Sequence, residues 1–146
     1  MDIKYVYFDS TPDNKIMEGI LFLHKNIFGN SDHLCHRMES KTNLLINIAI
    51  QNSKVIGYKI GYSLDNDKFY SWLGGVDVKY RNQGIASYLM EKQHEMLRKK
   101  GYIAVQTKTK NKWRSMLILN IKNGFDIIGT YTDDEGEPKI ILEKKL

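Results

Sequence analysis

The chain of 146 residues has the commonest size of a single domain, and its 42% hydrophobic residues are enough to form one core. The one cysteine, Cys35, excludes an intrachain disulfide, and neither a secretory signal nor a membrane-spanning apolar run is evident, so we expect a cytoplasmic protein with no membrane partner. The net charge of +5 favours an anionic partner, such as nucleic acid, an acidic substrate or a phosphate-bearing cofactor, although a solvated surface with a lysine excess explains it equally well.

The first third of the chain predicts one strand followed by two helices. Residues 3–8 alternate weakly between apolar and polar and predict the strand. Ser10 or Thr11 is the expected N-cap of a helix with apolar residues at helical spacing, and Gly29 ends it. The polar segment that follows contains a short helix around Leu34–Glu39.

The remainder of the chain alternates between strands and helices that end at glycine. The predicted strands span residues 44–51, 54–64, 69–78, 102–109, 125–131 and 139–143. The predicted helices span 84–100, closed by Gly101, and 113–123, closed by Gly124. This order predicts an α/β (α+β) fold in which a mixed sheet carries helices on both faces, and no linker divides residues 1–146 into domains.

The most informative stretch is the junction at which the strand 69–78 leads into the helix 84–100. A helix N-terminus leaves about four N–H groups without partners and carries partial positive charge, so it attracts anions. Gly84 has no Cβ and lets a phosphate approach the backbone, Ala86 keeps the next turn small, and Arg81 adds a fixed positive charge. The junction therefore predicts a pyrophosphate site, although a plain helix start has the same spacing.

Two adjacent glycines, Gly74 and Gly75, interrupt the strand before this junction. Paired glycines weaken a strand and often mark the close approach of another backbone. The two amides of a pantetheine arm would be one such guest, and a simple bulge is the alternative.

With these features in place, Arg81-x-x-Gly84-x-Ala86 resembles the (Gln/Arg)-x-x-Gly-x-(Gly/Ala) signature of the GNAT (Gcn5-related N-acetyltransferase) superfamily. The resemblance extends over the whole element order, so it implies one GNAT-like domain over residues 1–146 with a mostly antiparallel sheet. It also implies an N-acetyltransferase that uses acetyl-CoA and no metal. In such proteins a primary amine attacks the thioester directly in a ternary complex. The sequence leaves open whether the protein forms a homodimer.

The resemblance assigns the cofactor to the junction and its surroundings. Backbone N–H groups from Gln83 to Ala86 would hold the pyrophosphate, and the strand backbone at Val76 and Val78 would pair with pantetheine. Lys79, Lys108, Lys110 or Lys112 would meet the adenosine phosphate, with nothing to choose among them. The full set of cofactor residues that the resemblance implies is Val76, Val78, Arg81, Asn82, Gln83, Gly84, Ile85, Ala86, Ser87 and Asn111.

Two positions depart from the family pattern at the catalytic centre. The tyrosine that usually protonates the leaving thiolate is replaced by Asn120, which donates a hydrogen bond but does not transfer a proton usefully. The strand glutamate of some members is replaced by Tyr70, which either positions a water molecule or is an ordinary strand aromatic. A backbone N–H such as that of Val76 is the expected donor to the tetrahedral oxyanion.

Other polar residues are weaker candidates. The spacing of His33, Cys35 and His36 fits no structural zinc pattern, so we predict no metal, and His33, His36 and Glu39 remain candidate substrate contacts. Trp72 is expected in the core or in the wall of the acceptor cleft.

The acceptor is a small-molecule or peptide amine that the sequence leaves open: a small amine, an antibiotic, a polyamine or a protein N-terminus. The sequence leaves two rival functions. A CoA-binding module without turnover is suggested by the two catalytic departures. A basic RNA-binding domain is disfavoured because neither an RRM-type motif nor a KH-type Gly-x-x-Gly loop is present, so no nucleic-acid partner is expected.

Overall fold

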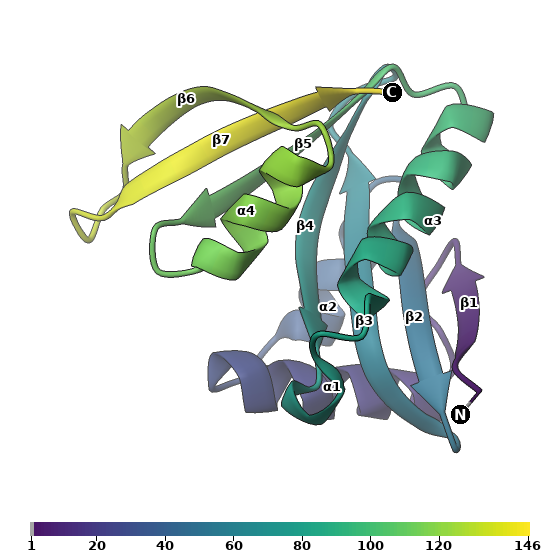
Figure 1. The fold of residues 1–146 in the computed structure, drawn as a ribbon. Coiled ribbons are helices and arrows are strands. Elements are labelled where there is room, and N and C mark those ends of the chain that lie inside the picture. Colours follow the sequence, from purple (N-terminus) through teal and green to yellow (C-terminus); the bar gives the residue numbers. More distant parts are fainter. Residues whose placement is uncertain (1) are drawn as a thin grey trace.

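The structure is a computed structural model that describes residues 2–146, and its centre is a sheet of seven strands in the order β1-β2-β3-β4-β5-β7-β6 (Figure 1). The strands are β1 (Lys4–Phe8), β2 (Leu45–Gln51), β3 (Lys54–Ser63), β4 (Lys68–Val76), β5 (Ala104–Lys110), β6 (Asp126–Thr132) and β7 (Pro138–Lys145). The helices are α1 (Asn14–Phe28), α2 (Leu34–Glu39), α3 (Ile85–Lys99) and α4 (Arg114–Lys122), with a 3₁₀ turn, η1, at Val78–Tyr80.

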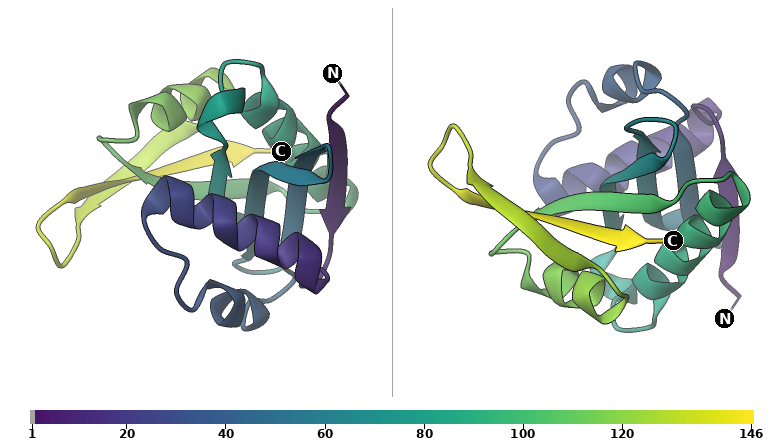
Figure 2. Two further views of the ribbon diagram at one scale, coloured as in Figure 1. Left: turned by 90° about the horizontal axis from the view of Figure 1, so that it is seen from below. Right: turned by 90° about the horizontal axis from the view of Figure 1, so that it is seen from above.

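The sheet is mixed and mostly antiparallel. β4 and β5 run parallel, because α3 carries the chain from the end of one strand to the start of the other, and every other neighbouring pair is antiparallel. α1 and α2 lie on one face, and α3 and α4 lie on the other (Figure 2). The predicted fold class is thereby confirmed.

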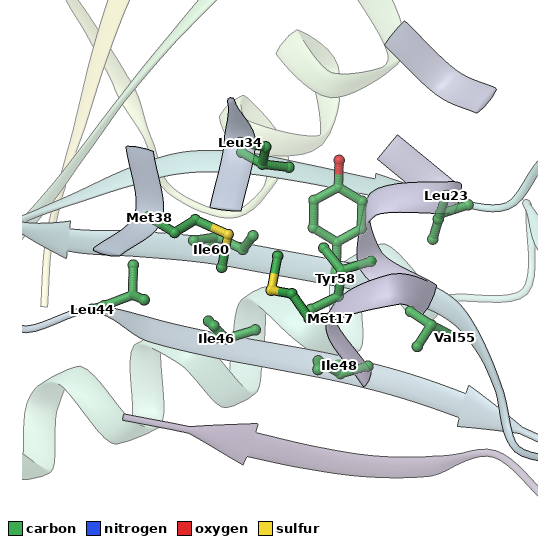
Figure 3. Close-up of a cluster of buried hydrophobic side chains, with 11 residues drawn as sticks. Met17, Leu23, Leu34, Met38, Leu44, Ile46, Ile48, Val55, Tyr58 and Ile60 are labelled. Carbon is green, nitrogen blue, oxygen red and sulfur yellow. The ribbon is translucent and has the colours of Figure 1, made fainter. Parts of the chain in front are cut away.

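Each face of the sheet has its own apolar layer. On the α1/α2 face, Met17 and Leu23 of α1 and Met38 of α2 pack against strand residues that include Ile46 and Tyr58 (Figure 3). The alternation of β2 and β3 places these strand side chains on one face. On the α3/α4 face, helix and strand side chains form two further clusters, which contain Leu45, Phe69, Met90, Leu97, Val105, Phe125 and Leu142, and Ala49, Ile56, Val76, Ile85 and Leu89.

The feature that creates a site is the partial separation of β4 from β5. The two strands pair only from Lys68 opposite Ala104 to Ser71 opposite Thr107, where the Thr107 hydroxyl donates to the Ser71 carbonyl at 2.9 Å. Beyond this point the strands diverge (Figure 1). We call the region in which Trp72–Val76 of β4 and Lys108–Lys110 of β5 no longer pair with each other the β4–β5 opening.

A β-bulge lies where the opening begins. Gly61 of β3 is opposite Ser71 and Ile60 is opposite Leu73, so Trp72 is the extra residue on β4. A bulge bends its strand and increases the local twist, and this turns β4 away from β5. The bulge also places Trp72 and Leu73 against the same apolar layer, on the α1/α2 face.

Two local predictions are corrected by the structure. Asp13, and neither Ser10 nor Thr11, caps α1, because its carboxylate accepts from the Ile16 N–H at 2.9 Å. The strand that was predicted to run to residue 78 ends at Val76. Val78 lies in η1, with its side chain 70% exposed, so its backbone does not continue the strand edge.

The bulge gives a direct test of the packing. A Cβ added to Gly61 would lie 2.5 Å from the Tyr70 carbonyl oxygen and 2.3 Å from the Phe69 ring, so we expect Gly61→Ala to lower the free energy of unfolding by about 3 kcal/mol. Gly129→Ala in β6 is the matched control, since a Cβ there meets nothing within 4 Å. Urea unfolding of both variants measures the difference, and equal stabilities would contradict the packing described at the bulge.

Candidate functional site

The start of α3 has the properties of an anion site. Gly84 is the N-cap with φ of 81°, no side chain caps the helix, and its first turn contains no acidic residue. α1 shows the contrast, because the Asp13 carboxylate there accepts from the Ile16 N–H in the first turn. The first N–H groups of α3 are therefore left to solvent or to a ligand, at the positive end of a 15-residue helix.

The turn before α3 adds to this arrangement. Asn82 and Gly84 both have left-handed backbone, with φ of 64° and 81°, and such alternation turns successive N–H groups into a concave anion-binding surface. Arg81 donates from Nε to the Val76 carbonyl at 3.1 Å, which holds its guanidinium between the end of β4 and the start of α3. Arg81, Asn82, Gln83 and Gly84 are all exposed, as are Lys79 and Ser87.

The edge of β4 leads from this turn toward the bulge. The Asp77 N–H donates to the Ile56 carbonyl, so the pair of Gly57 and Val76 is a non-hydrogen-bonded pair of the antiparallel ladder. The backbone groups of Val76, and of Gly74 two residues earlier, therefore point away from β3 into the β4–β5 opening. The five residues Trp72–Val76, at a rise of about 3.3 Å per residue, give this free edge of β4 a length of roughly 16 Å.

The two strand glycines have packing reasons as well as a place on this edge. A Cβ on Gly75 would lie 2.5 Å from Cδ1 of Ile27 in α1, and a Cβ on Gly74 would lie 3.3 Å from the Tyr58 carbonyl oxygen. Gly75 thus allows α1 to approach β4 closely. The bulge that we offered as the alternative reading exists, but at Trp72 and not at the glycines.

The structure gives the positions of the two predicted catalytic residues, Asn120 and Tyr70, and of the predicted cofactor residue Asn111. Asn120 is 2% exposed and is the one buried residue of α4. Tyr70 is half-buried in the paired part of β4, opposite Gln106. Burial, with smaller effects from Tyr62 and Tyr131, raises the pKa of Tyr70 to about 12, so its phenol is protonated at neutral pH. Asn111 lies in the exposed turn between β5 and α4.

A group of aromatic side chains lies at the inner end of the opening. The ring of Tyr62 is in edge contact with the rings of Tyr70 and Trp72, at centroid distances of 5.4 and 5.7 Å. Trp72 packs on the α1/α2 apolar layer, so this group lies on the face away from α3 and α4. Tyr131 of β6 joins it through Lys108, whose ammonium is 5.2 Å from the Tyr131 ring and 5.9 Å from the Tyr70 ring.

Cationic side chains cover the same rings. The guanidinium of Arg37 is 4.9 Å from the Trp72 ring, and the ammonium of Lys41 is 4.6 Å from the Tyr62 ring and 4.8 Å from Trp72. We call the rings and cations together the aromatic–cationic cluster: Arg37, Lys41, Tyr62, Tyr70, Trp72, Lys108 and Tyr131. Sequence reasoning identified Trp72 as a candidate cleft wall but did not group these residues, because they come from separate elements.

A second polar group, also missed from the sequence, is buried beneath α3. Gln93 and His94 of α3 are 0% and 2% exposed, and Asn47 of β2 is 4% exposed. Within residues 2–146, both amide atoms of Gln93, Nε2 of His94 and Oδ1 of Asn47 have no hydrogen-bond partner. Lys144 lies 3.3 Å from Nδ1 of His94, and since an ammonium only donates, Nδ1 accepts and the imidazole proton is on Nε2.

The cationic surroundings determine the protonation of this group. Burial, followed by the charges of Lys59, Lys144 and Arg98, lowers the pKa of His94 to about 3. Lys59 keeps part of its side chain exposed, but its dense surroundings desolvate the ammonium and lower its pKa to about 8. His94 is therefore neutral at every pH at which the protein is expected to work.

This protonation predicts a stability that depends on pH. Between pH 3 and 6.5 the unfolded chain protonates His94 and the folded chain does not, so the free energy of unfolding falls with decreasing pH by roughly 1.4 kcal/mol per pH unit from this residue. His94→Gln removes the titrating group, and its stability should depend less steeply on pH in that window. Urea unfolding at several pH values measures the free energy of unfolding of both proteins. Parallel dependences on pH for parent and variant would refute the buried, neutral state of His94.

The loop residues predicted as substrate contacts remain predictions. His33, His36 and Glu39 are exposed, and Glu39 accepts from the Cys35 thiol at 3.6 Å. Among residues 2–146, no three His, Cys, Asp or Glu side chains gather in a way that would hold a metal ion. None of the helices in that range is long and apolar enough to cross a membrane.

The comparison with protein families agrees with the geometry of the junction. The model of the Acetyltransferase (GNAT) family matches residues 14–114, which is more than half of the chain and includes the β4–α3 junction. The chain therefore belongs to the GNAT acetyltransferase family. No curated protein sequence matches it significantly.

Solved structures show the same fold at low sequence identity. Ard1 from Thermoplasma volcanium is 16% identical with a TM-score of 0.80, and the match covers 97% of each chain. A GNAT family acetyltransferase from Elizabethkingia anophelis with acetyl-CoA bound is 20% identical with a TM-score of 0.73, covering 99% of this chain and 98% of the other. The ribosomal-protein-S18-alanine N-acetyltransferase from Escherichia coli is 17% identical with a TM-score of 0.78, covering 97% and 94%.

Proposed function

We propose that the protein binds acetyl-CoA at the β4–α3 junction and transfers the acetyl group to a primary amine. The observation that carries the proposal is the uncapped start of α3, with Gly84 in left-handed backbone and Arg81 held beside it by the Val76 carbonyl. A structure of the same fold contains acetyl-CoA, which supports the choice of ligand.

The geometry suggests a course for the cofactor. N–H groups from Gln83 to Ala86 hold the pyrophosphate, and the pantetheine amides pair with the free β4 edge at Gly74 and at the Val76 N–H, in place of the contact first predicted at Val78. The Val76 carbonyl keeps its hydrogen bond from Arg81. The thioester then lies near the inner end of the opening, close to the bulge at Trp72. Asn111 and the basic residues near the junction remain candidates for the adenosine end.

The chemistry requires direct attack by a neutral amine on the thioester carbonyl. The C–N bond forms, the C–S bond breaks, and the proton that the attacking nitrogen loses passes to water. α3 and α4 pack on one face of the sheet, so we expect the acceptor to approach from the other face, on which the aromatic–cationic cluster lies. A free backbone N–H of β4 stabilises the tetrahedral oxyanion, and Asn120 donates a hydrogen bond to the departing sulfur. Because a thiol has a pKa near 8.5, the thiolate leaves without a strong acid. The phenol of Tyr70 stays protonated and acts as a hydrogen-bond donor that positions a water molecule.

The test is consumption of acetyl-CoA against a panel of amines: amino acids, small alkylamines, polyamines, an aminoglycoside and peptides with a free N-terminus. We expect turnover with one class, absent without an amine. Binding of acetyl-CoA without turnover across the whole panel would favour the alternative, a CoA-binding module.

A further inference from the structure

Resting on the proposed acetyl transfer, we propose that the acceptor amine also carries an anionic group, a carboxylate or a phosphate, which the aromatic–cationic cluster binds. The three cations of the cluster come from separate elements: Arg37 from α2, Lys41 from the segment that follows α2, and Lys108 from β5. They converge on rings that lie together at the inner end of the β4–β5 opening.

None of these three cations forms an ion pair within residues 2–146. Two carboxylates of β7 and of the turn before it are engaged elsewhere: Glu143 pairs with Lys68 at 3.2 Å and Glu137 with Lys110 at 3.6 Å. Glu39, on α2 beside Arg37, accepts from Cys35. The cluster therefore holds three cations, none of which has a carboxylate within ion-pair distance in residues 2–146.

The rings attract these cations but leave their N–H donors without a charged hydrogen-bond acceptor. A ring face attracts a cation by about 0.5–1 kcal/mol at an exposed site, whereas an ionised acceptor forms short, charge-assisted hydrogen bonds with the N–H donors. Arg37 and Lys108 are exposed and Lys41 is half-buried, so their donors are open to a ligand. An anion placed among them would relieve their mutual repulsion.

The position of the cluster connects this anion to the reaction. Lys108 is the first residue of β5 beyond the paired segment, and Tyr70 and Trp72 flank Ser71, at which the pairing of β4 ends. A small acceptor with its amine at the thioester thus has its anionic group within reach of the cluster. A polycationic acceptor, such as a polyamine or an aminoglycoside, would meet like charges there.

Fluorescence of Trp72 provides a readout at the cluster itself. The chain has two tryptophans, so Trp113→Phe leaves Trp72 as the only one. This protein, saturated with CoA, is titrated with two matched pairs of probes: N-acetyl-leucine against N-acetyl-leucinamide, and O-phosphoethanolamine against ethanolamine. We expect the anionic member of at least one pair to bind about tenfold more tightly than the neutral or cationic member, as one charge-assisted contact provides. The pair that shows the preference identifies carboxylate or phosphate.

The variants separate this proposal from a general effect of charge. Lys41→Gln with Lys108→Gln should abolish the preference, while Lys92→Gln should keep it, because Lys92 covers Tyr88 on α3, away from the cluster. Equal or weaker binding of both anionic probes, or a preference unchanged in the double variant, would overturn the proposal. CoA binding is measured separately. Absence of CoA binding would contradict the proposed function, whereas CoA binding without a preference for the anionic probes, in titrations with and without CoA, would contradict only the present proposal.

Discussion

Replacing Gly84 with valine is expected to weaken acetyl-CoA binding by about a hundredfold, the loss of two charge-assisted hydrogen bonds to the pyrophosphate. A Cβ at Gly84 meets no protein atom within 4 Å, so the side chain would extend into the space that we assign to the phosphates. The fold should lose only about 1–2 kcal/mol, because φ of 81° is strained for a residue with a Cβ.

Gly101 offers a matched control at the other end of the same helix. Its φ is 93°, and a Cβ there also meets nothing within 4 Å. Gly101→Val should therefore lower the free energy of unfolding by a similar amount while acetyl-CoA binds as tightly as to the parent. Calorimetric titration of both variants with acetyl-CoA measures the two affinities. Equal affinities would contradict the assignment of the pyrophosphate site to the start of α3.

Loss of the Asn120 side chain is expected to slow acetyl transfer by roughly fivefold to 150-fold, the effect of about 1–3 kcal/mol for one unmade buried hydrogen bond. The enzyme should be impaired but not inactive, because the thiolate leaves without a protein acid. Asn120→Tyr should restore or raise the rate, since it supplies an acid with a pKa near 10. Asn123→Ala at the C-cap of the same helix is the control, because the Asn123 amide donates to the Leu119 carbonyl at 2.8 Å and has no proposed role in the transfer.

The pH dependence of kcat distinguishes this role from general acid catalysis. Without a protein acid, the rate should rise with pH as the acceptor amine deprotonates and then level off. A bell-shaped profile in folded, CoA-bound enzyme would show that another residue donates the proton, and Asn120 would then need a different role.

Features encoded within a few neighbouring residues could be predicted from the sequence. Gly84 begins α3, and Gly29, Gly101 and Gly124 have positive φ at the helix ends where they were expected. These positions depend on local backbone sterics alone. The cap of α1 is a local error of a different kind, because Ser, Thr and Asp all cap helices and the sequence offered all three close together.

Features that depend on distant contacts could not be predicted. β7 inserts between β5 and β6 by pairing with β5 across the intervening α4 and β6, and the bulge at Trp72 depends on the exact register of the β3–β4 pair, which apolar/polar alternation does not fix. Lys59 lies in a strand of alternating residues, and its burial in the folded chain lowers the pKa of its ammonium to about 8, an effect that the sequence does not reveal. Asn120 and Tyr70 were reached through the family resemblance, and their roles stay predictions.

Binding of acetyl-CoA is the most direct test, because both the transferase and the alternative CoA-binding module require it. With acetyl-CoA at about 100 times its dissociation constant, the free energy of unfolding should increase by roughly 2.7 kcal/mol, with a corresponding upward shift of the melting temperature. Thermal unfolding with and without the ligand measures it, beside a GNAT enzyme of known activity. An unchanged melting temperature, while the reference enzyme is stabilised, would contradict the assignment of the β4–α3 junction as the cofactor site.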